Sequence, residues 1–597
     1  MIYDEFKNPT LPLLASVKRP GRYTGGEWGS FVKNMPDEKR AVRICLAFPD
    51  VYEVGMSYLG YQILYSLIKT LDYADAERAY CPWPDMEREM RASGIPLASL
   101  ESFRPLRDFD VLGFTLQYEL NATNILTMLD LGGVPLKASG RGDSAPIVIG
   151  GGSGACSPAP LEMFFDAFCI GEGEELLPEI LAVLGELKGR PRDERLDALS
   201  RIQNVYVPGA RARRTKTAIV ENLDKGFVNR TMVVPNVGII HDRVAVQVFR
   251  GCTRGCRFCQ AGMIGRPRRE RGVGSVASQI RDLLAQTGWD EVGLLSLATC
   301  DWSGLDEFIS TLGGELERGR VKLSLPSLRM DAFSVELASR LEGMRRGGVT
   351  FAPEAGSERL RRVINKGLSD DDVSMALDAA FKYGWDRVKL YFMMGLPTET
   401  ETDLDGIIEI ADRAVHQARI NKRRGEVNVS VAGFVPKSHT PFQWEPQAAR
   451  ESLRERGRYI KGRVRSKKIS LSYHEPDQTF LEGVFARGDA SLGPAILEAW
   501  LRGARFDGWT EYFDIRRWED VFRDGDIDAE GIALRSRGLD EPLPWDMIDA
   551  GVTKEFLARE RKRAFAELHT DDCAGGACNG CGWQNEFAGC SRTRGEA

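Results

Sequence analysis

The sequence predicts an α/β protein with three parts: an N-terminal Rossmann-like parallel sheet, a partial (β/α)6 barrel and an α-rich C-terminal extension. Two observations lead to this prediction. In residues 41–189, apolar strands alternate with amphipathic helices and short glycine turns, which indicates a doubly wound parallel sheet. Six further strand–helix units begin at residue 244, too many for a small open sheet and suited to a closed or partly closed barrel.

Each element is expected from its own pattern. Strands are predicted at 41–49, 109–116 and 145–152, with helices at 60–71, 119–133 and 174–189. The barrel strands are predicted at 244–252, 291–299, 321–329, 348–354, 387–397 and 427–436. We therefore expect domains at 1–190 and 241–470, a charged linker at 191–240, and an extension with a cysteine cluster at 471–597. Ligands of such sheets bind at the carboxyl ends of the strands.

The bulk composition is that of an ordinary globular protein. The chain has 597 residues, 43% hydrophobic and 28% charged, with a net charge of −6, so no polyanionic partner is demanded globally. There is no apolar run of the roughly 20 residues that span a bilayer, and the N-terminus lacks an export-signal pattern. We expect a cytoplasmic protein without a membrane partner, in which clustered cysteines favour metal binding over disulfides.

Seven of the 12 cysteines form two clusters. The first is RGCTRGCRFCQAG, with Cys252, Cys256 and Cys259 following a predicted strand. Interleaved glycines oppose a helix and favour a loop around a ligand, and the arginines between the cysteines favour thiolates. A structural zinc site would need a fourth ligand, whereas a four-iron cluster on three cysteines leaves one iron open.

This C-x3-C-x2-C motif, with Phe258 before the last cysteine, resembles the radical S-adenosylmethionine (SAM) superfamily. The resemblance implies a [4Fe-4S] cluster whose fourth iron binds SAM, and reductive cleavage of SAM to a 5′-deoxyadenosyl radical. A reductant such as flavodoxin or ferredoxin is then required. By matching motifs, the residues expected to bind SAM are Phe258, Ser296, Arg329, Glu354, Gly356, Ser357 and Gly395. Arg361 and Lys366 are interpreted as helix-surface charges.

Two further segments of the barrel bear on the substrate. FVPKSHTPFQW matches a strand end seen in subgroups with large or cobalamin-assisted substrates, so Lys437 and His439 are possible substrate contacts, although the histidine could equally be structural. RPRRERG (266–272) is usually a solvated face, but at the barrel mouth it leaves open a phosphate-bearing substrate such as RNA.

The N-terminal sheet resembles the cobalamin (vitamin B12)-binding domains that precede many radical SAM enzymes. Those domains carry Asp-x-His-x-x-Gly, where this chain reads DVYEVG, with tyrosine in place of histidine. Possible cobalamin residues are Asp50, Tyr52, Gly55, Gly150, Gly151 and Gly152. Because residues 1–240 contain no histidine, either cobalamin binds without one or the domain is only a scaffold.

The second cluster is Cys573, Cys578, Cys581 and Cys590, with glycines that allow the chain to fold inward. Four thiolates could close a zinc site or hold a second Fe–S cluster, or these could be unrelated reduced cysteines. We favour Fe–S, because the enzyme needs electrons.

The expected function is that of a radical SAM enzyme performing C–H functionalisation or, with cobalamin, methyl transfer. One alternative is a methylthiotransferase-like or other enzyme that modifies RNA or protein. Another is a non-catalytic Fe–S electron-transfer or partner subunit. The substrate is not specified by the sequence.

Overall fold

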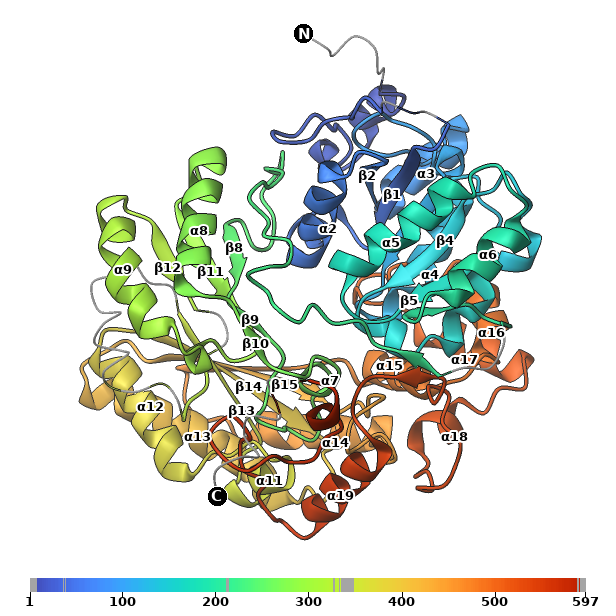
Figure 1. The fold of residues 1–597 in the computed structure, drawn as a ribbon. Coiled ribbons are helices and arrows are strands. Elements are labelled where there is room, and N and C mark those ends of the chain that lie inside the picture. The colour runs from blue at the N-terminus through green and yellow to red at the C-terminus, as the bar shows by residue number, and fades with distance from the viewer. Residues whose placement is uncertain are drawn as a thin grey trace.

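The computed structural model describes residues 8–35, 37, 39–210, 214–325, 328–331, 333, 335, 348–587 and 590. Two parallel sheet systems lie side by side, and C-terminal helices lie against both (Figure 1). This mixed α/β architecture confirms the predicted fold class.

The first sheet has six strands in the order β2-β1-β3-β4-β5-β6. All neighbours are parallel except β5 and β6. The order reverses direction at β1, so loops after β1, β3 and β4 meet at the carboxyl edge, where ligands of such sheets bind. The strands are β1 (Val42–Phe48), β2 (Ala74–Tyr80), β3 (Val111–Thr115), β4 (Ile147–Gly151), β5 (Ala167–Cys169) and β6 (Val205–Tyr206). The helices are α1 (Tyr52–Met56), α2 (Leu59–Thr70), α3 (Pro84–Ser93), α4 (Ala122–Leu131), α5 (Gly173–Glu186) and α6 (Arg192–Arg201).

Strand β2 was not predicted, because its sequence ADAERAY is charged. All seven of its residues are nevertheless buried. Arg78 forms ion pairs with Glu27 (3.0 Å) and Glu101 (2.6 Å), and Glu77 accepts a hydrogen bond from the hydroxyl of Ser102 (2.6 Å). The charges are satisfied inside the protein, which is the condition for burying them.

The second system is a partial barrel of parallel strands in chain order. Strands β8, β11 and β12 form one sheet and β13 to β16 another, and a bridge between Leu328 and Phe351 links the two. Among the described residues β8 does not pair with β16, so the barrel is open. The strands are β8 (Val244–Gln247), β11 (Glu291–Leu295), β12 (Lys322–Ser324), β13 (Val349–Glu354), β14 (Arg387–Met394), β15 (Glu426–Gly433) and β16 (Ile469–Tyr473). The short strands β9 (Phe249–Arg250) and β10 (Arg269–Glu270) flank the first cysteine loop.

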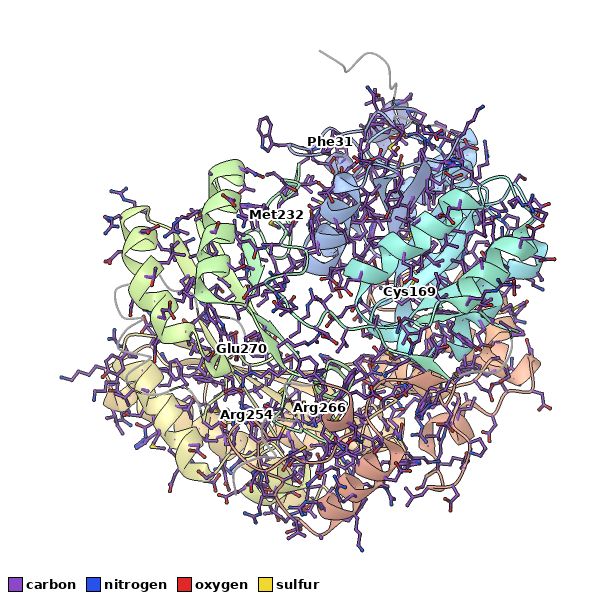
Figure 2. All side chains as sticks on the ribbon, in the orientation of Figure 1. Phe31, Cys169, Met232, Arg254, Arg266 and Glu270 are labelled. Carbon is purple, nitrogen blue, oxygen red and sulfur yellow. The ribbon has the colours of Figure 1, made fainter. Side chains whose placement is uncertain are left out.

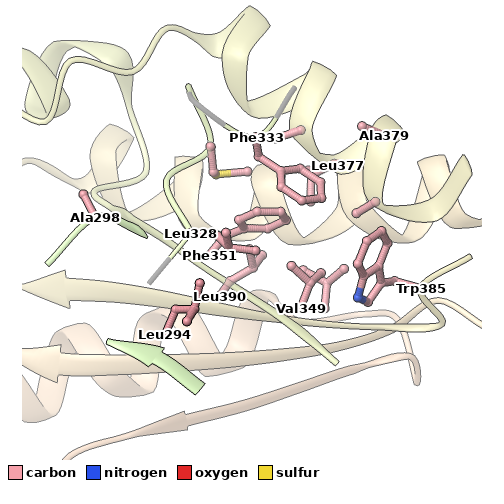
Figure 3. Packing of buried hydrophobic residues seen from close by; sticks show 14 of the residues in the cluster. Leu294, Ala298, Leu328, Phe333, Val349, Phe351, Leu377, Ala379, Trp385 and Leu390 are labelled. Atoms are coloured by element: carbon pink, nitrogen blue, oxygen red, sulfur yellow. The ribbon is translucent and has the colours of Figure 1, made fainter. Parts of the chain in front are cut away.

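Apolar residues on one side of the barrel strands pack against the surrounding helices. Figure 3 shows Val349 and Phe351 of β13 next to Leu390 of β14, with Phe333 and Trp385 above them. The rings of Phe333 and Phe351 meet edge-on, with centroids 5.2 Å apart. The helices of this part are α7 (Gln260–Ile264), α8 (Val273–Thr287), α9 (Leu305–Arg318), α11 (Glu358–Val363), α12 (Asp370–Lys382), α13 (Glu401–Ile420) and α14 (Arg450–Arg463).

The C-terminal extension packs on both sheet systems. Helices α15 to α18 share a hydrophobic core with β3 and α4 of the first sheet, including Phe114, Leu126, Phe485 and Trp518. Helix α19 packs instead beside the first cysteine loop (Figure 1). The bounds are α15 (Pro476–Arg487), α16 (Leu492–Leu501), α17 (Ile515–Asp524), α18 (Ala529–Leu534) and α19 (Lys554–Phe565); β17 (Ile548–Asp549) pairs with β7 (Thr215–Lys216). Over the described residues, every helix is too short or too polar to cross a bilayer.

Candidate active site

The first cysteine cluster forms a loop between β9 and α7. Gly251 has φ +79°, and a Cβ there would lie 2.4 Å from the carbonyl oxygen of Pro267, so only glycine fits. Cys259 caps α7, its sulfur accepting a hydrogen bond from the Gly262 amide (3.3 Å). A Cβ on Gly262 would lie 3.4 Å from Cys259 Sγ and 4.0 Å from Cys252 Cβ, so these two cysteines flank the same glycine.

Residues of the C-terminal extension hold the cysteine loop in place. Arg257 is completely buried, and its guanidinium donates to Glu560 of α19 (3.1 Å) and to the carbonyl oxygen of Leu568 (2.8 Å). The Arg257 amide also donates to the carbonyl oxygen of Ile364 (2.9 Å). The segment between Cys256 and Cys259 is therefore fixed by residues far away in sequence.

The arginines within the cysteine loop are each paired with a carboxylate. Arg250 pairs with Glu172 (3.1 Å), Arg254 with Asp331 (3.1 Å) and Arg257 with Glu560, so carboxylates offset all three charges. Arg257 remains in electrostatic range of Cys256, and the cations nearest the other two cysteines come from elsewhere in the chain. They are Arg266 and Arg329, which act on Cys252, and Lys366, which acts on Cys259.

Burial is the main influence on the pKa values of Cys252 and Cys259. It raises the pKa of Cys259 to about 12, with the neighbouring Cys256 adding to the effect, and it also raises the pKa of Cys252. Thiols with a raised pKa stay protonated in water near pH 7. A metal ion that binds the thiolate favours the deprotonated form instead. The loop is suited to holding metal and poorly suited to free thiol nucleophiles.

Among the expected SAM residues, Arg329 and Glu354 are connected to the surroundings of the cysteines, and Ser296 follows a barrel strand. Arg329 lies in electrostatic range of Cys256, and its guanidinium donates to the carbonyl oxygen of Lys366 (2.7 Å). The Nζ atom of Lys366 pairs in turn with Glu354 (3.2 Å), which ends β13 with φ +69°. Ser296 follows β11 and hydrogen-bonds Thr299 (3.0 Å).

The other expected SAM residues have structural neighbours. A Cβ on Gly356 would lie 2.2 Å from the carbonyl oxygen of Asp403 in α13, so this glycine permits a close backbone approach. Ser357 caps α11 by accepting from the Leu360 amide (3.1 Å). Gly395, with φ +82°, donates its amide to Glu399 (3.0 Å), and Phe258 packs in a small apolar cluster with Phe434 and others.

Two basic residues interpreted as surface charges are in fact internal. Arg361 is completely buried and donates to the carbonyl oxygens of Gly356 (3.0 Å) and Leu368 (2.9 Å). Lys366 is also buried and pairs with Glu354. The sequence pattern suggested one exposed helix face for both residues. Helix α11 instead ends at Val363, and the loop that carries Lys366 folds inward.

The basic run RPRRERG is likewise internal, which corrects the interpretation of a solvated or RNA-binding face. Arg269 makes a two-pronged ion pair with Glu172 (2.8 and 2.9 Å), and Arg271 donates to the carbonyl oxygen of Leu223 (2.6 Å). Both side chains and that of Arg266 are buried. These charges cannot neutralise the phosphates of a nucleic acid.

A cavity of about 290 Å³ lies between the first sheet and the cysteine loop. Its wall includes Gln260, the residue directly after Cys259. Gln260 donates to the Ser438 hydroxyl (2.8 Å). Lys437, a predicted substrate contact, also lines the cavity and pairs with Glu119 (2.6 Å) and Glu482 (2.7 Å). The first sheet contributes its carboxyl edge, through Pro49, Leu116, Gln117, Tyr118, Ser153 and Gly154.

His439 does not line the cavity. It is buried and its Nε2 hydrogen-bonds the carbonyl oxygen of Cys156 (3.0 Å), which joins the barrel to the first sheet. Burial lowers its pKa to about 4, so the ring is neutral near pH 7. The structure supports the structural alternative for this histidine.

None of the residues suggested for cobalamin lines this cavity, although their sequence neighbours Pro49, Ser153 and Gly154 do. Asp50 accepts from the Trp509 indole (3.0 Å), and the Tyr52 hydroxyl donates to Glu27 (3.1 Å) in the N-terminal segment. A Cβ on Gly55 would lie 2.4 Å from the ring of Tyr80. Of the three later glycines, Gly150 and Gly151 lie in β4 and pair with β3, while a Cβ on Gly152 would lie 2.7 Å from the carbonyl oxygen of Leu116.

Two family models match the chain at these two sheet systems. "Radical SAM proteins, N-terminal" matches residues 60–208, and "Radical SAM superfamily" matches residues 246–411, which contain all three loop cysteines. The protein is a radical SAM enzyme. Its family uses a [4Fe-4S] cluster and SAM as cofactors, and the enzyme therefore requires an electron donor.

Several known proteins are similar to the chain over much of its length. The chain is 25% identical to the uncharacterized protein MJ0966 of Methanocaldococcus jannaschii over 76% of its length and 90% of that protein. It is 22% identical to the ribosomal protein uS12 methylthiotransferase RimO of Treponema denticola, over 53% of its length and 73% of that protein. The methyltransferase TsrM from Kitasatospora setae aligns with a TM-score of 0.47 at 15% identity, covering 68% of this chain and 77% of that one. The cobalamin-dependent enzyme OxsB aligns with a TM-score of 0.48 at 13% identity, covering 89% and 84%.

The cysteine loop of this radical SAM enzyme fits an iron–sulfur cluster. A [4Fe-4S] cluster with three thiolates is anionic, and Arg266, Arg329 and Lys366 supply nearby positive charge. The Gly262 amide supplies the hydrogen bond to sulfur that such clusters commonly receive. Within the described ranges no three candidate ligands surround a single-ion position; a cubane instead binds each cysteine at a separate iron.

Sequence reasoning missed Arg266, Gln260 and Lys366 as parts of this site. Gln260 could have been found, because it directly follows the last loop cysteine. Arg266 lay within the run read as a surface patch, and Lys366 in a segment read as a helix face. Neither residue has a local pattern that indicates burial.

Proposed function

We propose that this radical SAM enzyme removes a hydrogen atom from an unactivated carbon of a substrate bound in the cavity beside Gln260. The observation that carries the proposal is the position of Gln260, which is both next to Cys259 and in the cavity wall. The bound cluster and SAM together supply a 5′-deoxyadenosyl radical. A substrate in this cavity is separated from the cysteine loop by a single residue.

The chain's own residues position the reactants and exclude water. Cys252, Cys256 and Cys259 hold the cluster, and Arg329 and Glu354 are the proposed contacts for the carboxylate and ribose of SAM. Lys437 lies between Glu119 and Glu482, and these carboxylates raise its pKa, so the ammonium stays charged. The cavity therefore presents both signs of charge beside apolar side chains such as Phe485 and Ile496, which favours a polar substrate with an apolar part.

Reductive SAM cleavage is the first test. The anaerobically reconstituted protein with dithionite and SAM is expected to release 5′-deoxyadenosine, measured by mass spectrometry. Cys256→Ser is expected to abolish it, whereas Cys169→Ser, in β5 of the first sheet and outside both cysteine clusters, is expected to leave it intact. Absence of 5′-deoxyadenosine from a wild-type protein that holds its iron would overturn the proposal.

A second candidate is cobalamin-assisted methyl transfer, favoured by the cavity's place at the edge where the sheet order reverses. In flavodoxin-like sheets this point binds large cofactors. The groups that would hold the cofactor are Gln117, Ser153 and Gly154. The present volume of about 290 Å³ is at the low end of the roughly 300–1,000 Å³ typical of ligand pockets, so a whole corrinoid requires α15 and α16 to shift outward. Cobalamin supplies methyl-transfer chemistry when bound.

Hydroxocobalamin titration followed by absorbance tests this second candidate. Ala486→Leu fills the cavity from α15 and is expected to weaken binding at least tenfold, while Ala92→Leu on the exposed face of α3 is the matched control. Equal binding by both variants, or none by the wild type, would remove cobalamin from the reaction. A product assay with labelled SAM distinguishes the remaining reaction types. The product gains a methyl group in methyl transfer and a methylthio group in the reaction that the name of the RimO relative suggests.

A further inference from the structure

The segment that leads into the tail cysteines is bound directly to the first cysteine loop. Thr570 and Asn365 exchange hydrogen bonds: the Thr570 amide donates to Asn365 Oδ1 (2.8 Å) and Asn365 Nδ2 donates to the Thr570 carbonyl oxygen (3.1 Å). Asn365 Nδ2 also donates to the carbonyl oxygen of Arg254 (3.1 Å) in the loop. Asp572 pairs with the Arg254 side chain (3.1 Å). Cys573, the residue after Asp572, therefore lies beside the first cysteine loop.

Arg266 lies between the two sets of cysteines. Its guanidinium lies in electrostatic range of Cys581 and Cys573 on one side and of Cys252 on the other. The side chain is buried, with 3% of the residue exposed. Figure 2 labels Arg266 and Arg254 where the barrel meets the C-terminal segment.

The charge of Arg266 has no carboxylate to balance it among the described residues, and its Nη2 atom has no nitrogen or oxygen partner. Its Nε atom reaches only the Gly262 carbonyl oxygen (3.3 Å), and the ring of Phe556 lies 5.3 Å away. A buried guanidinium needs a counter-charge, because desolvating an unpaired ion costs several kcal/mol. Sulfur is the anionic atom that the site offers.

Three of the tail cysteines, Cys573, Cys581 and Cys590, lie in electrostatic range of this cation, although among the described residues no three candidate ligands converge on a single-ion position. Cys573 is in electrostatic range of Cys581 and Cys590, and Cys590 of Cys578. The chain turns back at Gly582, whose φ is +128° and whose Cβ would lie 2.5 Å from the carbonyl oxygen of Gly551. The Gly580 amide donates to Cys578 Sγ (3.5 Å), as the Gly262 amide does to Cys259.

We propose that Cys573, Cys578, Cys581 and Cys590 hold a second iron–sulfur cluster, separated from the SAM-binding cluster by the Arg266 guanidinium. Four thiolates could also hold zinc, but zinc cannot change oxidation state, and this site shares its cation with a centre that consumes one electron per SAM cleaved. The second cluster, reduced by a flavodoxin- or ferredoxin-type donor, passes one electron to the first and is oxidised by one. This role, unlike the site itself, rests on the proposed function.

Metal analysis of three full-length proteins tests the site. The anaerobically reconstituted wild type is expected to hold about eight irons per chain, four in each cluster, measured with acid-labile sulfide and zinc. Replacing Cys573, Cys578 and Cys581 with serine, or replacing Cys252, Cys256 and Cys259, should each halve the iron and sulfide. Cys169→Ser, in β5 of the first sheet, is the control and should change neither.

The outcomes separate the two proposals. The second cluster is overturned if the tail variant keeps the iron content of the wild type. This holds whether the variant loses zinc or neither protein contains zinc. If the wild type holds two clusters but makes no 5′-deoxyadenosine, the proposed function fails and the site stands. The tail variant should still cleave SAM with dithionite, which reduces the first cluster directly, but should be slowed at least tenfold with the protein donor.

Arg266→Gln tests the placement independently of iron content. Removing a cation between two anionic clusters makes each harder to reduce, so redox titration followed by electron paramagnetic resonance should show both potentials shifting downward. A shift of one cluster alone would contradict the shared cation. Arg268→Gln, in the same run but beside Glu270, is the matched control.

Discussion

Replacing Glu560 by glutamine should release the cysteine loop from helix α19. The carboxylate is the charged partner of Arg257, with side-chain exposures of 0% for the arginine and 3% for the glutamate at a distance of 3.1 Å. Removing one partner of such a buried pair costs roughly 3–5 kcal/mol. Arg257 keeps the carbonyl oxygens of Arg362, Val363 and Leu568 as acceptors, so we expect the lower figure.

A cost of about 3 kcal/mol corresponds to a roughly 150-fold larger population of the locally open state. Amide hydrogen exchange is the suitable assay, because a chain of several domains does not unfold in one step. Exchange should accelerate by about this factor in residues 250–264 and 554–570 and stay unchanged in the first sheet. Bound iron should also be lost faster to a chelator.

The matched control is Glu555→Gln, the same change at an exposed position of the same helix. It should leave exchange in both segments unchanged. If Glu560→Gln behaves like Glu555→Gln, the buried ion pair does not hold the loop and the reasoning is refuted.

Three further predictions follow from the geometry. Gly356→Ala places a Cβ 2.2 Å from the Asp403 carbonyl oxygen and should destabilise the protein by about 1–3 kcal/mol or more, seen as a lower Tm; Gly274→Ala, with open space around it, should not lower Tm. The pKa of His439 is about 4, below the usual 6.5, so the folded state binds the proton less readily and its contribution, about 3 kcal/mol, is lost as pH falls from 6.5 toward 4. Tm measured against pH should therefore fall more steeply for the wild type than for His439→Gln, and parallel curves would contradict this. Burial raises the pKa of Asp50 to about 6, so its ionised form lowers stability increasingly as pH rises from about 4 to 6. Asp50→Asn, which keeps an acceptor for Trp509, should then match or exceed the wild-type Tm at pH 7.5, and Asp50→Ala, which leaves the indole unpaired, should fall below it.

The strands and helices that sequence patterns predicted are those whose burial follows a regular period. Strand β1 and helix α2 were recognised because their apolar residues face the core in the expected order. Strand β2 carries three buried charged residues, and their partners include Glu27 and Glu101, which are distant in sequence. Local pattern cannot predict a buried ion network whose members come from different segments.

The same distinction applies to the active site. The three loop cysteines could be predicted because one short segment contains all of them. The residues that influence their charge could not be predicted, because Arg329 and Lys366 come from distant segments of the chain and Glu560 lies 303 positions after Arg257. The run RPRRERG was misread because charge density alone does not reveal carbonyl partners such as that of Leu223.

The 303 positions between Arg257 and Glu560 also set an order of events during synthesis. At roughly 5–20 residues per second, the cysteine loop leaves the ribosome some 15 to 60 seconds before α19 can close beneath it. In that interval Arg257 has no access to its carboxylate partner. The burial of the loop against α19 is therefore a late event in folding, reached only after the C-terminal extension has been made.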